Sequence, residues 1–223
     1  VAALNTTQLA AIETNDFAVL TTAQIRAIDA AKVAALTSDQ ISALKPTQAA
    51  SLYSAQVAAF TTAQVAALSS ADVAVMSSVQ FVGLNSAHVA ALTTAQIAQL
   101  TTTELRGLTT VTAPSLTTAQ VIAMTSDQLA SLSSTQLASF NTAEIAAIET
   151  RDLAGLNSAQ LRALGTDDVR ALTTAQIVAL NSAQLSSLTT TQVAALTTAQ
   201  VATIETGDVS ALTSAQIGAF NTA

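Results

Sequence analysis

The chain has 223 residues and a net charge of −7; hydrophobic residues make up 50% of it, aromatic residues 3% and charged residues 9%. Its seven basic residues are too dispersed to form a positive patch, so no nucleic-acid or anionic-membrane partner is expected. The longest apolar runs fall far short of the roughly 20 residues that span a bilayer, so no membrane insertion is expected. The absence of Cys excludes disulfides and thiolate metal sites.

An eight-residue repeat organises the chain. From Asn5 to Phe220 the sequence divides into 27 octads without insertion or deletion, beginning with Asn5–Ile12, and the consensus is Thr-Thr-Ala-Gln-Val-Ala-Ala-Leu. Octad position 8 is Leu, Ile, Phe or Met throughout, and position 4 is Gln in seventeen octads and acidic in seven. Incomplete octads at both ends lead us to expect one continuous array over residues 1–223, itself a segment of a longer array.

Two regular structures fit this period poorly. In one long helix an eight-residue repeat advances about 800°, so the apolar positions drift about 80° per octad and form no stable stripe. In a β-solenoid, positions 5 and 8 would point to opposite faces, and the Ala content disfavours strands. We keep the β-solenoid as the alternative, since short strands and short helices give similar patterns.

A short helix that starts again in every octad fits best. With position 1 as the N-cap, position 4 falls at N3, so that Thr-x-x-Gln forms a capping box. The same register places position 8 of the preceding octad and position 5 at the two sites of a hydrophobic staple. An N-cap at position 2 would instead explain why position 2 is Ser or Thr more consistently than position 1. Both registers remain open.

The octads must share one core. Burying two aliphatic side chains returns about 1.5–3 kcal/mol each, whereas ordering eight residues costs about 1–2 kcal/mol per residue. We therefore predict an all-α solenoid of short helices, one per octad, with positions 5 and 8 inside and the small position 7 where helices approach closely. Positions 3 and 6 should face outward, because eight charged residues fall there: Arg26, Asp39, Arg106, Asp127, Arg151, Arg162, Asp167 and Arg170.

The octad also carries a resemblance. Thr-Thr-Ala-Gln-Val-Ala-Ala-Leu stands verbatim at Thr61–Leu68 and nearly so in the two octads from Thr189 to Ile204. It resembles the Leu-Thr-x-x-Gln-Ile/Val arrays of very large bacterial secreted or cell-surface proteins, although position 2 is often Pro there and only Pro46 matches. The resemblance implies an extracellular, adhesin-like or fibre-forming role and brings no catalytic residue.

Several residues depart from the consensus, and each has a structural interpretation that we prefer. Asn5-Thr6-Thr7 is a formal glycosylation sequon. Three carboxylate pairs could bind Ca²⁺ or do acid–base chemistry, but they occupy cap and N3 positions, where negative charge suits a helix start. The single histidine, His88, replaces the usual Gln and makes neither a triad nor a metal site. The three pairs are Glu13/Asp16, Glu149/Asp152 and Glu205/Asp208.

Two octads should be irregular. In Thr109–Leu116, Thr112 replaces Gln, Ala113 replaces the large residue and Pro114 falls inside the helix, so we expect a local distortion, either a hinge or a tolerated lesion. Lys45-Pro46, with Ala49 in the core and Tyr53 next, marks a milder irregularity.

These features predict a non-enzymatic structural protein: an extracellular spacer, stalk or self-assembling filament or surface-layer subunit on or outside a bacterial cell. We expect no catalytic, cofactor-binding or metal site, no small-molecule substrate, and end-to-end or lateral self-association. The alternative is a solenoid scaffold that binds a protein, a glycan, or an ice or mineral surface through its rows of Thr and Ser hydroxyls.

Overall fold

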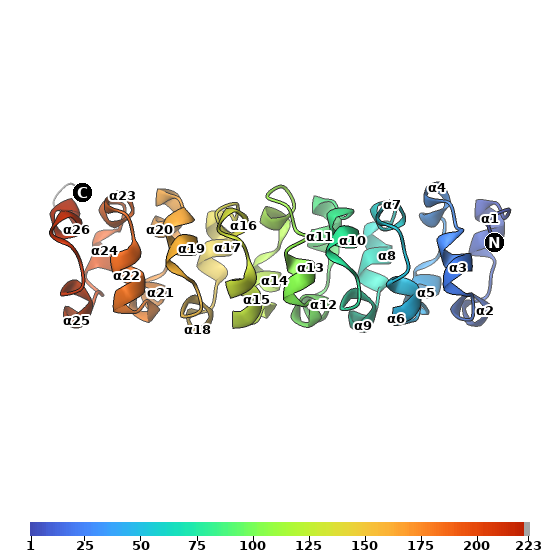
Figure 1. Cartoon of the computed structure of the whole chain (residues 1–223), viewed down its shortest axis with the longest axis horizontal. Coiled ribbons are helices and arrows are strands. Elements are labelled where there is room, and N and C mark those ends of the chain that lie inside the picture. The colour runs from blue at the N-terminus through green and yellow to red at the C-terminus, as the bar shows by residue number, and fades with distance from the viewer. Residues whose placement is uncertain (221–223) are drawn as a thin grey trace. The chain divides into compact units, whose positions relative to one another are not determined.

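The computed structural model describes residues 1–220, and every helix in that range is short (Figure 1). Two compact units, Val1–Leu116 and Thr117–Ala223, make up the chain. In the first, the helices are α1 (Thr6–Ala10), α2 (Thr14–Ala18), α3 (Thr22–Arg26), α4 (Ala30–Val33), α5 (Ser38–Ser42), α6 (Pro46–Ala49), α7 (Ser54–Ala58), α8 (Thr62–Ala67), α9 (Ser70–Val73), α10 (Ser78–Val82), α11 (Ser86–Ala91), α12 (Thr94–Gln99), α13 (Thr102–Leu105) and the 3₁₀ turn η1 (Ala113–Ser115).

The second unit continues the same pattern of one helix per octad. Its helices are α14 (Thr118–Ala123), α15 (Ser126–Ser131), α16 (Ser134–Leu137), α17 (Thr142–Ala147), α18 (Thr150–Leu153), α19 (Ser158–Ala163), α20 (Thr166–Ala171), α21 (Thr174–Ala179), α22 (Ser182–Ser187), α23 (Thr190–Ala194), α24 (Thr198–Val201), α25 (Thr206–Val209) and α26 (Ser214–Ala219). Residues 1–220 contain no strand, so the all-α solenoid is confirmed and the β-solenoid is wrong.

The helix register is settled by the caps. Each α-helix begins after an N-cap at octad position 1 whose backbone is extended, as at Thr21 (φ −70°, ψ 158°). There the Gln24 backbone N–H donates to Thr21 Oγ1 at 3.2 Å, and the Thr21 N–H donates to Gln24 Oε1 at 2.8 Å. These two bonds are the predicted capping box, and they exclude the alternative N-cap at position 2.

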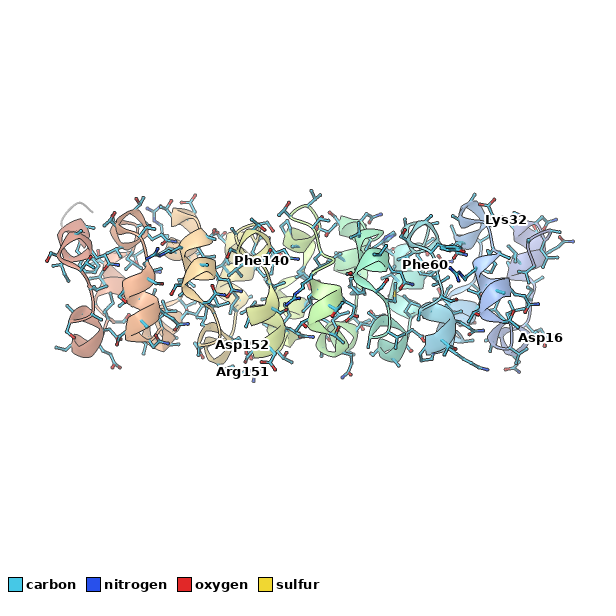
Figure 2. All side chains as sticks on the ribbon, in the orientation of Figure 1. Asp16, Lys32, Phe60, Phe140, Arg151 and Asp152 are labelled. Atoms are coloured by element: carbon cyan, nitrogen blue, oxygen red, sulfur yellow. The ribbon has the colours of Figure 1, made fainter. Side chains whose placement is uncertain are left out.

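The core is built from positions 5 and 8, as predicted. Position-5 residues such as Val65 and Leu137 are fully buried, and so are position-8 residues such as Phe60 and Phe140, which are 4% and 3% exposed (Figure 2). The charged residues at positions 3 and 6 are exposed, including Arg26. The hydrophobic staple therefore lies inside each unit.

Helices pack on the helix three octads away. In the first unit α5 packs on α8 and α9 on α12, and in the second α17 packs on α20 and α23 on α26. Hydrogen bonds that join octads four apart are described below. One superhelical turn within each unit therefore takes between three and four octads.

The predicted irregularities have different outcomes. Octad Thr109–Leu116 forms only η1, because Pro114 removes a helical N–H, which confirms the distortion. Thr109 and Thr112 still exchange two capping hydrogen bonds: the Thr109 N–H donates to Thr112 Oγ1 at 2.9 Å, and the Thr112 N–H donates to Thr109 Oγ1 at 3.2 Å. The first unit ends at Leu116. In the milder case α6 forms normally with Pro46 at its first position, while the side chains of Lys45 and Tyr53 make no cap hydrogen bond.

At two octads, position 7 lies very close to a backbone carbonyl three octads earlier. A Cβ added at Gly83 would lie 2.6 Å from the Ser54 carbonyl oxygen, and one added at Gly107 would lie 2.6 Å from the Ser78 oxygen and 2.7 Å from Phe81 Cβ. The close approach predicted for position 7 is confirmed at these two glycines.

We predict that Gly107→Ala destabilises the chain by about 1–3 kcal/mol, because the new methyl group overpacks a backbone contact. Gly207→Ala is the control, since a Cβ there meets nothing within 4 Å. Thermal unfolding followed by far-UV circular dichroism measures both. Equal melting temperatures for the two variants would contradict the close approach.

Candidate functional site

The polar side chain at octad position 4 is buried and does more than close a capping box. In Gln64, Oε1 accepts from the Thr61 backbone N–H at 2.8 Å, while Nε2 donates to the carbonyls of Val33 at 2.9 Å and Leu36 at 2.6 Å. These carbonyls belong to positions 5 and 8 of the octad four repeats earlier. We call this three-way arrangement the amide bridge.

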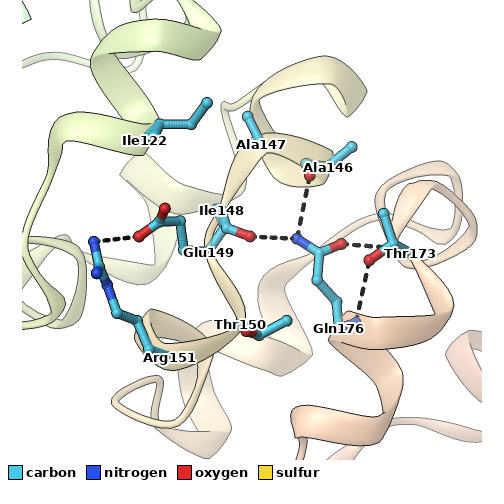
Figure 3. Close-up of a pocket in the computed structure, with 9 residues that line it drawn as sticks. All are labelled: Ile122, Ala146, Ala147, Ile148, Glu149, Thr150, Arg151, Thr173 and Gln176. Atoms are coloured by element: carbon cyan, nitrogen blue, oxygen red, sulfur yellow. Dashed lines mark hydrogen bonds and ion pairs between the residues drawn. The ribbon is translucent and has the colours of Figure 1, made fainter.

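The amide bridge recurs in both units. Twelve glutamines donate to the position-8 carbonyl 28 residues earlier and to a second carbonyl 30 or 31 residues earlier. They are Gln40, Gln48, Gln56, Gln64, Gln80, Gln96, Gln160, Gln176, Gln184, Gln192, Gln200 and Gln216. Gln176 is the example in Figure 3, where Nε2 donates to the Ile148 carbonyl at 2.7 Å. Sequence reasoning assigned the oxygen of this amide and missed the partners of its nitrogen.

Two other residue types at position 4 keep the donor. His88 Nε2 lies 2.7 Å from the Phe60 carbonyl oxygen, 28 residues earlier, so this nitrogen carries the proton. Lys32 Nζ donates to the carbonyls of Leu4 at 2.8 Å and Ala2 at 3.1 Å. The interpretation of His88 as a substitute for Gln is therefore confirmed.

Acidic residues at position 4 have no such donor. Asp72 Oδ2 accepts from the Ser69 N–H at 3.1 Å and from Ser69 Oγ at 2.6 Å, while its Oδ1 is buried without a hydrogen-bond partner. Burial raises the pKa of Asp72, and the hydrogen bonds from Ser69 partly oppose the increase. Burial also raises the pKa of Asp168, which the backbone hydrogen bond from Gly165 lowers and the nearby Asp167 raises further.

Glu144 is the most perturbed of these acids. Its Oε2 accepts from the Asn141 N–H at 2.6 Å, and its Oε1 is buried without a partner. Burial raises the pKa of Glu144 to about 7, against the lowering effect of the Asn141 backbone hydrogen bond. At neutral pH this carboxyl group is therefore partly protonated.

The three carboxylate pairs lie at N-cap and N3 positions, as predicted, but the glutamates make no side-chain cap hydrogen bond. Asp152 Oδ1 and Asp208 Oδ1 each accept from a serine hydroxyl three octads earlier, Ser126 and Ser182, both at 2.5 Å. Neither link was predicted. Within residues 1–220 no group of three or more His, Asp or Glu side chains is placed to hold a metal ion.

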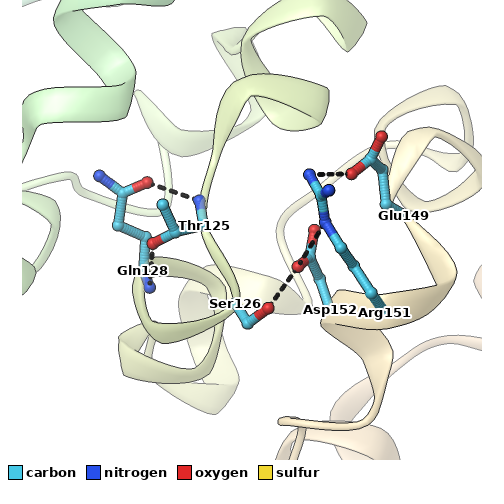
Figure 4. A network of polar contacts seen from close by, with 6 residues as sticks. All are labelled: Thr125, Ser126, Gln128, Glu149, Arg151 and Asp152. Atoms are coloured by element: carbon cyan, nitrogen blue, oxygen red, sulfur yellow. Dashed lines mark hydrogen bonds and ion pairs between the residues drawn. The ribbon is translucent and has the colours of Figure 1, made fainter.

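A surface hollow lies beside one of these pairs. It has a volume of about 530 Å³ and is lined by Glu149, Arg151, Ile122 and Gln176, among others (Figure 3). Arg151 Nη2 pairs with Glu149 Oε2, and Arg151 Nε lies 3.5 Å from Asp152 Oδ1 (Figure 4). The charges of this hollow are thus matched to one another.

We predict that Gln64→Met destabilises the chain by about 2–4 kcal/mol, because one buried N–H and two buried carbonyls lose their partner. The matched control is Gln99→Met, an exposed position-7 glutamine of the same unit. Chemical denaturation compares the two. A loss no larger than that of the control would contradict the amide bridge.

We also predict that His88→Gln is neutral or stabilising by up to about 1 kcal/mol, whereas His88→Phe is destabilising. A glutamine restores a normal bond to the Asn85 N–H, which lies 3.4 Å from His88 Nδ1. A melting temperature for His88→Phe at or above that of His88→Gln would be the contrary result.

Comparison with known proteins agrees with the repeat. A model of the ALTTAQ repeat matches residues 9–46, 65–102, 145–182 and 175–203, which together span more than half of the chain. A search of curated proteins finds no match. None of the helices in residues 1–220 is long and apolar enough to cross a membrane.

Proposed function

Because the chain belongs to the ALTTAQ repeat family, we propose that it is a non-enzymatic structural protein that serves as an extracellular spacer, stalk or self-assembling filament subunit. The observation that carries this proposal is the use of the buried polar side chains. At position 4 they bind the backbone of their own and of an earlier octad, as in Gln64 and His88, and so serve the architecture.

We propose that copies of the chain associate end to end through the contact that joins octads within each unit. Gln8 and Gln24 are exposed, and their Oε1 atoms accept the cap N–H while no carbonyl in residues 1–220 accepts from their Nε2. Within residues 1–220, no glutamine amide donates to the position-5 and position-8 carbonyls of the last octads, and a hollow of about 250 Å³ lies among Val193, Val201 and Phe220. Donors at one end thus match acceptors and apolar surface at the other.

A location outside a bacterial cell is the second part of the proposal. One support is the resemblance of the octad to the arrays of secreted and cell-surface proteins. The other is that the chain has no Cys, so it has no thiol that a reducing compartment would have to protect. Fractionation of the native source measures it directly, and a cytosolic location would overturn this part alone.

A binding scaffold is the second candidate function. Arg26 lies 4.4 Å over the ring of the exposed Tyr53, beside a hollow of about 260 Å³ that Val79 also lines. A surface with an aromatic ring, a cation and an apolar wall suits a peptide or a glycan. The self-association experiment separates the two functions.

We predict that the purified chain forms fibres or elongated oligomers, seen by electron microscopy and sedimentation velocity. Gln8→Glu with Gln24→Glu should weaken this association, because the carboxylates cannot donate to carbonyls, while Gln99→Glu should leave it unchanged. Monomers at every concentration would contradict the assembly proposal and favour the scaffold. Turnover of any substrate in a hydrolase panel would contradict the non-enzymatic one.

A further inference from the structure

The amide bridge needs a hydrogen-bond donor, and the chain shows this in three residue types. Gln64 donates through its amide, His88 through an imidazole N–H and Lys32 through its ammonium group, each to a carbonyl 28 residues earlier. An ionised carboxylate is the one position-4 group here that can only accept. An oxygen of such a group close to carbonyl oxygens is repelled by them.

Glu144 is a buried acid at this position. Glu has the same shape as Gln, and Glu144 Oε2 accepts from the cap N–H of Asn141 at 2.6 Å, as Gln176 Oε1 accepts from Thr173 at 2.7 Å. Glu144 Oε1 therefore occupies the place that Nε2 has in a glutamine. It is buried and has no partner.

We propose that two buried acids at octad position 4, Glu144 above all and also Asp72, are proton-dependent joints. When the carboxyl group is protonated, it is neutral, so its burial carries no charge penalty and the octad stays closed. When the proton leaves, a buried carboxylate without a donor remains and the octad loosens. The array thus contains local sites whose stability falls as the pH rises, while the neighbouring glutamine amide bridges do not titrate.

The surroundings of Glu144 supply no counter-charge. Helices α14 and α20 pack on α17, and α14 carries no charged residue. On α20, Asp167 and Arg170 face each other at the surface 3.5 Å apart, and Asp168 accepts from the Gly165 N–H at 2.9 Å. Burial is the dominant cause of the raised pKa of Glu144, so a proton is what neutralises the group.

Asp72 lies in a similar setting in the first unit. Helices α6 and α12 pack on α9 and carry no charged residue. Lys45, the residue directly before α6, is charged but exposed. The buried Oδ1 of Asp72 has no partner, although its shorter side chain reaches less far than that of Glu144. Glu144 is therefore the better residue to test.

The expected pH dependence follows from the raised pKa. The folded chain binds the Glu144 proton more tightly than the unfolded chain does, so the stabilisation is complete below about pH 4.5 and is lost as the pH rises through about 7. Glu144→Gln keeps this buried side chain neutral at every pH. Its melting temperature should exceed that of the unaltered chain by about 2–4 °C at pH 8, and the difference should shrink toward pH 4.5.

Two matched variants accompany this test. Asp127→Asn removes an exposed position-3 charge of the same unit and should show no such pH-dependent difference. Gln176→Glu places a carboxyl group opposite the Ile145 and Ile148 carbonyls, 3.0 and 2.7 Å from the present Nε2, and should create a second joint that is weaker at pH 8 than at pH 5.

Carboxyl ¹³C NMR of the folded chain, assigned with Glu144→Gln, measures the proton directly. A titration midpoint near 7, with faster amide hydrogen exchange in Asn141–Ile148 at pH 8 after correction for intrinsic rates, is the expected result. A midpoint below 5, or a Glu144→Gln gain that does not vary with pH, would overturn the proposal. Neither outcome depends on self-association.

Discussion

A buried primary amide, whose oxygen and nitrogen both bond to the backbone, is the interaction on which this fold depends. An octad contributes only two large apolar side chains, and that burial is too small to offset the ordering of eight residues. The amide bridge adds three hydrogen bonds per octad and joins backbones that are 28 to 31 residues apart, as Gln64 does. Short helices, which nucleate poorly alone, are thus stabilised by contacts outside themselves.

Much of this could be predicted from the sequence. The capping box and the staple fix the helix register from adjacent residues, and Thr21 with Gln24 shows the box as expected. Proline chemistry predicted the defect at Thr109–Leu116. The long-range half of the amide bridge could not be predicted, because in a strict octad repeat every candidate partner looks the same. A glutamine that donates to the octad two, three, four or five repeats earlier would meet the same residue types. The sequence pattern therefore does not indicate how many octads make one turn.

The same limit explains why sequence did not separate buried acids from exposed ones. The carboxylate pairs were read as helix-start charges, and their placement at caps and N3 positions is confirmed. Whether such an acid is surrounded by solvent or by carbonyls depends on the octads of another turn, which sequence alone does not position. Glu144 and Glu149 illustrate the difference: one is buried with a raised pKa, and the other pairs with Arg151 at a surface hollow.

Each octad contacts octads three and four repeats away, and this spacing limits which insertions and deletions the fold tolerates. When a whole octad is duplicated or lost, every remaining cap, core residue and amide still has an equivalent partner. A single inserted residue, by contrast, misaligns each donor with the carbonyl 28 residues earlier until about four octads have passed. Length should therefore vary among relatives in steps of eight, while the spacing within an octad stays fixed.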